Sequence, residues 1–420
     1  MTIEMTTLEN GMRIATDRME TIETVSLGVW VDVGTRHEPA DRNGISHLLE
    51  HMAFKGTRKR SALDIAVAVD NVGGQLNAYT CREHTAYYAK VLREDTALAI
   101  DIVADVLQNS LLDQEDLRRE QQVVVQEINQ TLDTPDDIIF DYFQLAAYPD
   151  QALGRSVLGR AEMVRSMNSE VVADFMRAHY SARRMVLAAA GRVDHDQLVR
   201  LADQAFTELP PHQPGVAEAA RYTGGDWREE RDLEQVHIVL GFNGVAYNDP
   251  DFYTASVLSA LIGGGMSSRL FQEVREKRGL AYAVSSFTVP YQDSGLFGIY
   301  VGTGEEDVVE LIPVLCQELV KLTARATETE IRRAQAQVRA GLLMALESSG
   351  SRCEQLARQL LVYGRPISVQ EAVARVEAAD SAAVTQLAHR ILHSPLTFAA
   401  LGPIGKLESF DGICSRLPKN

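Results

Sequence analysis

Apolar and polar positions along the chain follow two kinds of periodicity, and the same series of patterns occurs twice. In the first half, residues 11–19 and 24–34 alternate with a period of two and are rich in β-branched side chains, which predicts strands. A helix closed by glycines, a β-hairpin and two long helices are predicted next, at residues 61–74, 75–92, 93–112 and 113–132.

The second half repeats this series in the same order. Its strand, hairpin and two long helices are predicted at residues 235–247, 280–303, 305–322 and 328–346. Residues 208–226, between the halves, are rich in Pro, Gly and Ala, which is typical of an exposed linker. We therefore expect an α+β protein of two homologous domains, residues 1–214 and 215–420, each a mainly antiparallel sheet packed with helices.

The composition narrows the class of protein. The 420 residues carry a formal net charge of −17, which argues against nucleic acid as a partner, because binding a phosphate backbone requires basic surface. No apolar run is long enough to cross a bilayer and no leader sequence is recognisable, so we expect no membrane association and a cytoplasmic location in a bacterial-type cell. The four cysteines (Cys81, Cys316, Cys353 and Cys414) lie far apart and predict neither a disulfide framework nor a thiolate metal site.

One short apolar segment, "NGISHLLEHMAFKGT" (residues 43–57), carries polar groups that a core helix does not need. In a helix His47 and His51 lie one turn apart on one face, and Glu50 points within about 60° of His47. Two imidazoles in this arrangement can both bind a tetrahedral zinc ion, with Glu50 beside the metal. A third protein ligand must come from elsewhere in the chain.

Glu127 is the candidate for this third ligand. It lies on the helix predicted at residues 113–132, about two turns after Glu120, so the two carboxylates share a face. The corresponding positions of the second half hold Ala334 and Gly341, which places the chemistry in the first half. We assign Glu127 to the metal and Glu120 to an imidazole N–H in the surrounding shell.

Hydrolysis is the chemistry that this set of residues favours. A zinc ion would lower the pKa of its water toward about 7, and Glu50 would act as the general base that passes the proton to the leaving group. We expect one zinc ion per chain, although two His and one Glu also suit cobalt or manganese. A core in which both histidines hydrogen-bond to neighbouring groups is the alternative that the spacing leaves open.

The H-x-x-E-H motif is the inverted zinc motif, and the chain resembles the pitrilysin/insulinase family of zinc peptidases, close to the mitochondrial processing peptidases and their bacterial relatives. The segments that resemble family blocks are "GISHLLEHMAFKGT", "REQQVVVQEI", "LNAYTCREHTAYY", "LGRSVLG" and "SSRLFQEVREKRGLAYAV". The resemblance implies a zinc endopeptidase for unfolded peptides, whose two domains form half of a clam-like chamber. Noncatalytic subunits of a respiratory complex share this resemblance, so an assembly role stays an alternative, as does hydrolysis of a non-peptide substrate.

The resemblance also implies groups that hold the substrate. Asn77 and Ala78 would bind an extended peptide along a free strand edge beside the zinc, although a plain hairpin strand is the alternative. Arg275 and Tyr282 would reach the peptide backbone from the second half, although the residues alone make Arg275 a solvated charge.

Partners are predicted from the same resemblance. Residues 263–265 resemble the glycine-rich loop of the noncatalytic processing-peptidase subunit, and because one chain holds both this loop and the zinc set, we expect a homodimer. The net charge of −17 and the resemblance together predict basic, presequence-like peptides as substrates.

Overall fold

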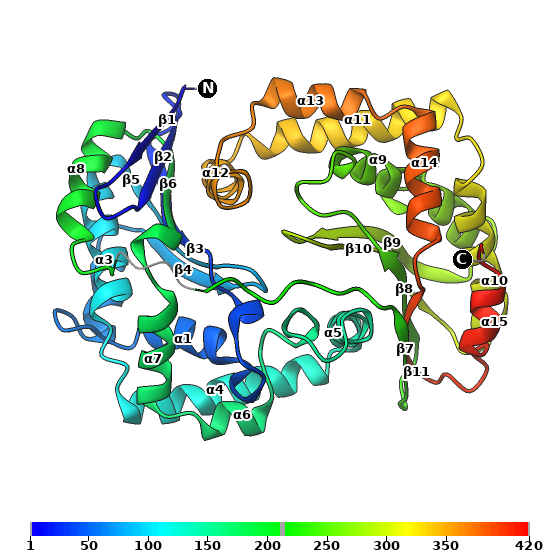
Figure 1. Ribbon diagram of the computed structural model, residues 1–420, viewed down its shortest axis with the longest axis horizontal. Helices are drawn as coiled ribbons and strands as arrows, with labels where there is room; N and C mark the ends of the chain where they lie inside the picture. Colours follow the sequence, from blue (N-terminus) through cyan, green and yellow to red (C-terminus); the bar gives the residue numbers. More distant parts are fainter. Residues whose placement is uncertain (1, 211–214, 419–420) are drawn as a thin grey trace. The chain divides into compact units, whose positions relative to one another are not determined.

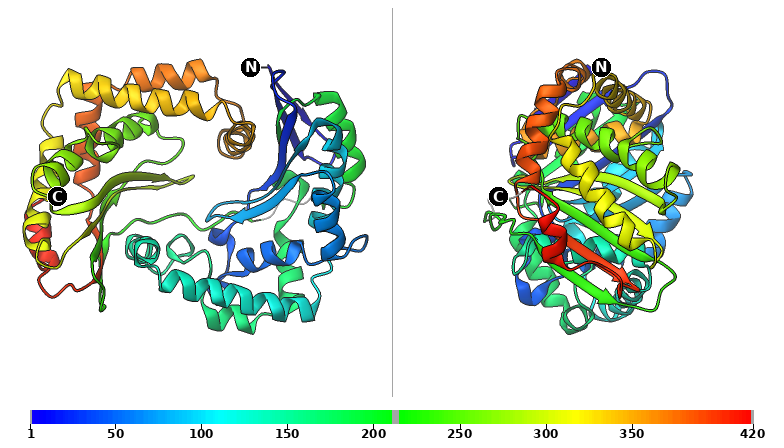
Figure 2. Two further views of the ribbon diagram at one scale, coloured as in Figure 1. Left: turned by 180° about the vertical axis from the view of Figure 1, so that it is seen from behind. Right: turned by 90° about the vertical axis from the view of Figure 1, so that its right-hand side faces the viewer.

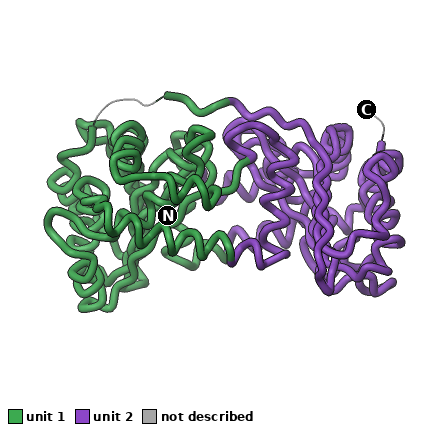
Figure 3. The backbone as a smooth tube through the Cα atoms, turned by 90° about the horizontal axis from the view of Figure 1, so that it is seen from below, with its two compact units in different colours: residues 1–129, 155–218, 344–366 green, residues 130–154, 219–343, 367–420 purple. Residues whose placement is uncertain are grey.

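The computed structural model of the protein describes residues 2–210 and 215–418 (Figure 1). Two sheets with accompanying helices are present, which confirms the expected α+β class. The chain divides into two compact units, shown in different colours in Figure 3. Unit 1 comprises Met1–Asn129, Arg155–Glu218 and Met344–Pro366, and unit 2 comprises Gln130–Gly154, Ala219–Leu343 and Ile367–Asn420.

The sheet of unit 1 has six strands in the order β1-β2-β6-β3-β5-β4. Their bounds are β1 (Thr2–Thr7), β2 (Arg13–Arg18), β3 (Thr24–Val31), β4 (Gln75–Thr80), β5 (Thr85–Leu92) and β6 (Met185–Gly191). All neighbours are antiparallel except β2 and β6, which are parallel. Strand β6 was not predicted from the sequence, because a strand buried on both faces is a continuous apolar run without alternation, and alanine favours strands weakly.

Helices cover both faces of this sheet. Those of unit 1 are α1 (Ile45–Ala53), α2 (Ala62–Asp70), α3 (Thr96–Asn109), α6 (Ala161–Ser166), α7 (Ser169–His179), α8 (His195–Ala205) and α12 (Ser349–Tyr363), and α4 (Gln114–Leu132) runs from unit 1 into unit 2. Figures 1 and 2 show α3 and α8 on one face of the sheet and α12 on the other. Successive residues of β6 alternate between these two cores: Leu187 packs with the α3 side and Val186 with the α12 side.

The sheet of unit 2 has five strands in the order β7-β11-β8-β10-β9, and only β7 and β11 are parallel within the described residues. Its strands are β7 (Gly225–Glu230), β8 (Val236–Asn243), β9 (Ala281–Pro290), β10 (Gly295–Thr303) and β11 (Thr397–Gly402). Its helices are α5 (Pro135–Ala147), α9 (Phe252–Gly263), α10 (Val308–Leu322), α13 (Val369–Glu377), α14 (Ser381–Leu392) and α15 (Phe410–Ser415), and α11 (Glu328–Ala345) runs from unit 2 into unit 1.

Shorter helical segments connect these elements. The 3-10 turns are η1 (Thr35–His37), η2 (Ala40–Arg42), η3 (Arg93–Asp95), η4 (Ala152–Gly154) and η5 (Ala182–Arg184), and η6 (Phe271–Glu276) is a π-helical segment. Among residues 2–210 and 215–418, no helix is both long and apolar enough to span a lipid bilayer.

One helix of each unit comes from the other half of the chain. In unit 2, α5 packs Ile139 and Phe143 against strands of the second half of the chain, among them β8 and β11. In unit 1, α12 packs Leu356 and Leu360 against the sheet of the first half, and Arg352 forms an ion pair of 3.1 Å with the buried Asp17. The compact units therefore do not follow the chain in two uninterrupted halves.

The boundary expected at Pro214 lies outside the described residues, and the division into residues 1–214 and 215–420 stays a prediction.

Candidate metal centre

The polar side chains of the H-x-x-E-H motif lie on the face of helix α1 that its buried apolar residues do not occupy. Ile45, Leu48, Leu49 and Met52 are fully buried in the core of unit 1, and this stripe orients the helix against the sheet. His47 is buried, whereas His51 and Glu50 are partly exposed. The apolar stripe of α1 thus presents the three polar side chains to the neighbouring elements of the same unit.

The two histidines converge on one carboxylate oxygen of α4. The Nε2 atoms of His47 and His51 each lie 3.6 Å from Oε2 of Glu127, and the two imidazole centroids are 4.7 Å apart. One ligand atom from each of the three residues lies within 4.8 Å of the others. Among the described residues this is the one such group of three His, Cys, Asp or Glu side chains.

These atoms are spaced as a small metal ion requires. Two ligands that are each about 2.0–2.1 Å from a tetrahedral zinc ion lie about 3.3–3.4 Å from one another, close to the distances in the structure. The Glu127 side chain is 42% exposed, so the centre is open to solvent on the carboxylate side. An open side is what a catalytic site needs and a closed structural zinc site lacks.

The electrostatics of the group favour a cation. Burial, together with the charge of His51, lowers the pKa of His47 to about 4, so its imidazole is neutral and able to bind a metal. Burial also opposes the charged form of His51, but Glu127 and Glu120 outweigh burial and raise the pKa of that imidazole. The interaction with His51 lowers the pKa of Glu127, which keeps the carboxylate ionised. A divalent ion would bind the neutral form of His51, so metal binding and protonation of this imidazole would compete.

The outer nitrogen atoms of the two imidazoles differ in their surroundings. His51 Nδ1 lies 3.1 Å from Oε2 of Glu120, whose other oxygen accepts a bond of 2.8 Å from Lys55 Nζ. The structure therefore brings Glu120 next to the His51 imidazole, and its role beside a bound metal stays a prediction. Lys55 is a further contact that was not predicted from the sequence. His47 Nδ1, by contrast, is buried and has no hydrogen-bond partner among the described residues.

Glu50 is held by a residue of the neighbouring hairpin. Oγ1 of Thr80, at the end of β4, donates a hydrogen bond of 2.6 Å to Oε2 of Glu50. Burial raises the pKa of Glu50, and the hydrogen bond from Thr80 opposes this effect. The alternation along "QLNAYT" puts Thr80 on the same face as Ala78, but no local signal shows that this face meets α1.

Strand β4 is an edge of the unit 1 sheet, and within residues 2–210 and 215–418 one side of its backbone has no partner strand. Asn77 is exposed and Ala78 is partly exposed on this strand. The side-chain oxygen of Asn77 accepts a hydrogen bond of 2.8 Å from the backbone N–H of Ala78. A peptide that adds to this edge would have to compete with that internal bond.

Arg275 and Tyr282 lie together in unit 2, where η6 leads into β9. The Arg275 guanidinium donates a bond of 3.1 Å to the backbone oxygen of Tyr282 and stacks on its ring, 4.5 Å from the centroid. Tyr282 is 78% exposed. The structure thus brings the two predicted residues together, and their contact with a substrate stays a prediction.

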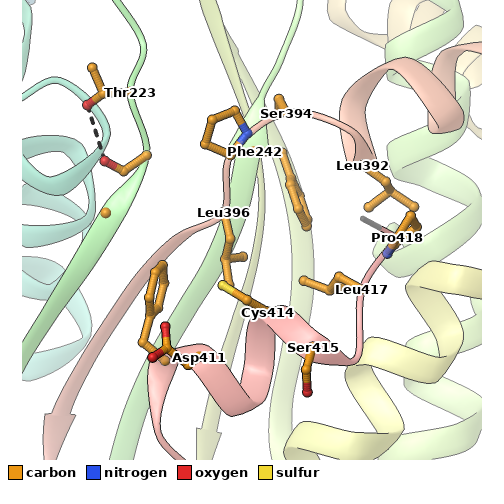
Figure 4. A pocket seen from close by; sticks show the side chains of 14 residues that line it. Thr223, Phe242, Leu392, Ser394, Leu396, Asp411, Cys414, Ser415, Leu417 and Pro418 are labelled. Atoms are coloured by element: carbon orange, nitrogen blue, oxygen red, sulfur yellow. Dashed lines mark hydrogen bonds between the residues drawn. The ribbon is translucent and has the colours of Figure 1, made fainter. Parts of the chain in front are cut away.

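Unit 2 also contains a hollow of about 510 Å³, which is lined by residues of α14, α15, β7 and β8 and of the segments next to them (Figure 4). Phe242, Leu396 and Leu417 are among the mostly apolar residues that line it. Its titratable groups are Asp411 and Cys414, and burial raises the pKa of the Cys414 thiol. A protonated thiol is a weak nucleophile, so these groups do not favour hydrolytic chemistry there.

Comparison with known proteins agrees with the asymmetry between the two halves. Residues 13–161 match the family described as Insulinase (Peptidase family M16), and this segment contains the histidine pair and Glu127. Residues 166–338 match the Peptidase M16 inactive domain. This segment contains Ala334, which occupies the position in the second half that corresponds to Glu120 in the first.

Individual relatives extend over nearly the whole chain. An uncharacterized zinc protease of Rickettsia felis is 40% identical over 400 residues, which cover 94% of this chain and 96% of that protein. The mitochondrial-processing peptidase subunit beta of Mus musculus is 37% identical over 429 residues, which cover 99% of this chain and 87% of that protein. A chain of a Complex III2 structure from Candida albicans shares the fold, with a TM-score of 0.88 at 21% identity over 98% of this chain and 99% of that chain.

These matches define the class as the family of zinc peptidases with a two-domain α+β fold. The chain belongs to the insulinase family, peptidase family M16, and the resemblance inferred from its sequence is confirmed.

Proposed function

We propose that this protein is a zinc endopeptidase that cleaves unfolded, basic, presequence-like peptides, with Glu50 as the general base. The observation that supports it most is the convergence of His47 and His51 on Glu127, beside Glu50 and on the open side of the helix pair. In this proposal the three converging residues hold one zinc ion per chain. The ion would supply Lewis-acid polarisation of the peptide carbonyl and would lower the pKa of water.

Side chains of the protein transfer the proton of the attacking water and hold the transferring group in place. Glu50 removes a proton from the attacking water and delivers it to the leaving amine. The Thr80 hydroxyl restricts the rotamers of Glu50 while it does so, through the bond to Oε2. Glu120, itself bound by Lys55, orients the His51 ring.

The peptide is held along its backbone. An extended peptide pairs with the free edge of β4, where the N–H of Ala78 exchanges the side-chain oxygen of Asn77 for a peptide carbonyl. Arg275 and Tyr282 supply further contacts to peptide oxygens. Backbone recognition of this kind requires an unfolded substrate, and the formal charge of −17 favours a basic one.

We also propose that the chain acts as a homodimer within a closed chamber, and in the cytoplasm. The zinc set and the glycines at residues 263–265 occur in the same chain, which supports assembly from identical copies. Light scattering on the purified protein tests this directly: a mass of twice 46.3 kDa is expected, and a single-chain mass that still cleaves peptides would refute the dimer.

The activity is tested with a basic unfolded peptide of roughly 10–30 residues and an acidic peptide of the same length, with cleavage detected by mass spectrometry. Wild type is compared with Glu50→Gln and with Glu115→Gln, which alters an exposed acid at the start of α4. Metal content is measured for all three proteins.

Each outcome bears on a different part of the proposal. Cleavage by wild type and Glu115→Gln but not by metal-loaded Glu50→Gln supports Glu50 as the base. Metal-loaded wild type that cleaves neither peptide would refute the peptidase proposal and favour a noncatalytic role. Equal cleavage of the acidic peptide at low salt would refute the electrostatic part alone.

A further inference from the structure

The first turn of α1, which contains His47, has no side-chain cap from its N-cap residue. Its N-cap position is Gly44, with φ of +97°, and glycine has no side chain to accept a hydrogen bond from the first turn. The leading N–H groups of a helix have no partners within the helix and need acceptors from elsewhere. The acceptor in this structure comes from Glu38, six residues before Gly44.

The Glu38 carboxylate binds the beginning of α1 with both oxygens. Oε2 accepts from the backbone N–H of Gly44 at 2.8 Å and from the Asn43 amide at 2.9 Å, and Oε1 accepts from the backbone N–H of Ser46 at 2.8 Å. Glu38 is only 3% exposed. Burial raises the pKa of Glu38, but the N–H donors oppose this, and the positive end of the helix dipole also favours the anion.

The loop at residues 155–159 also binds the segment that precedes α1. Arg155 donates through Nη2 to the backbone oxygen of Glu38 at 2.6 Å, and the Asn43 amide donates its other hydrogen to the backbone oxygen of Ser156 at 3.0 Å. The two backbones are in contact, since a Cβ atom on Gly159 would lie only 2.4 Å from the Asn43 oxygen. Residues 155–159 belong to the "LGRSVLG" segment. The start of α1 is thus bound by two loops of unit 1, the one that contains Glu38 and the one at residues 155–159.

The two candidate ligands of α1 differ in what orients them. His51 has Glu120 at its outer nitrogen, whereas the outer nitrogen of His47 is buried with no hydrogen-bond partner among the described residues. Metal-binding imidazoles usually rely on such an outer partner for their orientation. The orientation of His47 therefore depends on its backbone, which follows directly after the Ser46 N–H that Glu38 binds.

We propose that Glu38 is a positioning residue of the metal centre: its carboxylate fixes the first turn of α1 and thereby the placement of His47 relative to Glu127. This inference rests on the proposed function, because it assumes that His47 binds zinc. It assigns to a residue nine positions before His47 the role that Glu120 has for His51.

The test measures zinc affinity of the folded protein by competition with a chromogenic chelator, without any peptide. Glu38→Gln keeps the size of the side chain but puts an NH₂ group against N–H donors. Its zinc dissociation constant is expected to rise about 10- to 100-fold, as for other outer-shell partners of metal ligands. The matched control is Glu318→Gln, which alters a carboxylate of unit 2 that is also 3% exposed and is expected to leave zinc affinity unchanged.

A second readout separates positioning from general loss of stability. The visible absorption of the Co²⁺-loaded protein reports the geometry of the ligands, and we expect it to change in Glu38→Gln but not in Glu318→Gln. If Glu38→Gln does not fold, Glu38→Asp replaces it, with an expected rise of the dissociation constant in the same direction.

The outcomes keep the two proposals apart. Wild type that binds no zinc would refute the proposed function. Wild type that binds zinc, together with a folded Glu38 variant of unchanged zinc affinity and unchanged Co²⁺ spectrum, would overturn the positioning role alone.

Discussion

The hydrogen bond from Thr80 to Glu50 leads to a prediction about the pH dependence of peptide cleavage. Thr80→Val keeps the shape of the side chain and removes the donor that lies 2.6 Å from Oε2 of Glu50. A hydrogen bond to a charged group contributes about 1.5–3 kcal/mol, and about 1.4 kcal/mol corresponds to one pKa unit. Losing it is therefore expected to raise the pKa of Glu50, and the lost free energy corresponds to about a tenfold or larger change in the ionised fraction on the acid side.

The direction of this pKa change follows from burial and from the Thr80 hydroxyl, the two largest influences on the Glu50 carboxyl group. Burial raises the pKa of Glu50 and the Thr80 hydroxyl opposes this, so without the hydroxyl the carboxylate is protonated at higher pH. A protonated Glu50 cannot act as a base, and the acid limb of kcat/KM against pH should move upward in Thr80→Val. The loss is expected to be about tenfold or more on that limb and smaller at high pH, where Glu50 is ionised in both proteins.

The assay is cleavage of one basic peptide at a series of pH values, with metal content measured at each. Thr80→Ser keeps the hydroxyl and should keep the wild-type profile. Thr85→Val is the matched control, because it removes a buried hydroxyl of the same hairpin that donates to Val33 instead of Glu50. An acid limb of Thr80→Val that coincides with wild type, or one that Thr80→Ser shifts equally, would refute the reasoning.

Three further predictions concern the metal ligand, an ion pair and the substrate contact. Zinc at a hundredfold excess over its dissociation constant should raise the free energy of unfolding of wild type by about 2.7 kcal/mol, and that of Glu127→Gln much less, as measured by urea unfolding with and without zinc. The hydrogen bond from Arg269 lowers the pKa of Glu330 from 4.5 to about 2, so this carboxylate adds stability that is present above its unfolded pKa and is lost as pH falls toward 2. Urea unfolding of wild type and Glu330→Gln should therefore differ most above about pH 5 and converge in acid. Arg275→Ala should raise KM about tenfold in peptide cleavage kinetics, with zinc content unchanged.

A different result would contradict each of these three predictions. Equal stabilisation of Glu127→Gln by zinc would remove Glu127 from the metal centre. A constant difference between wild type and Glu330→Gln at every pH would show that the ion pair with Arg269 does not set the acid sensitivity. Unchanged KM in Arg275→Ala would leave this guanidinium as a structural partner of Tyr282.

Local patterns in the sequence were sufficient for the helices that carry the site. The spacing of His47 and His51 places them on one face of any helix, and the apolar residues between them show which face is buried. The hairpin and the two long helices were also predicted close to their observed bounds, because their periodicity is strong. The loss of both carboxylates from the second half pointed to chemistry in the first half alone, and the match to an inactive domain agrees.

The sequence by itself therefore determined which residue types are present, how they are spaced and which face of the predicted helices and hairpin strands is apolar. The tertiary structure decided the partners: β6 between β2 and β3, α12 on the sheet of unit 1, Thr80 against Glu50, and Glu38 at the start of α1. An amphipathic pattern shows that a surface will be covered but not by what, because burial depends only on the exclusion of water. A hydrogen bond needs its two partners within about 3 Å, and only the folded chain brings residues distant in sequence that close.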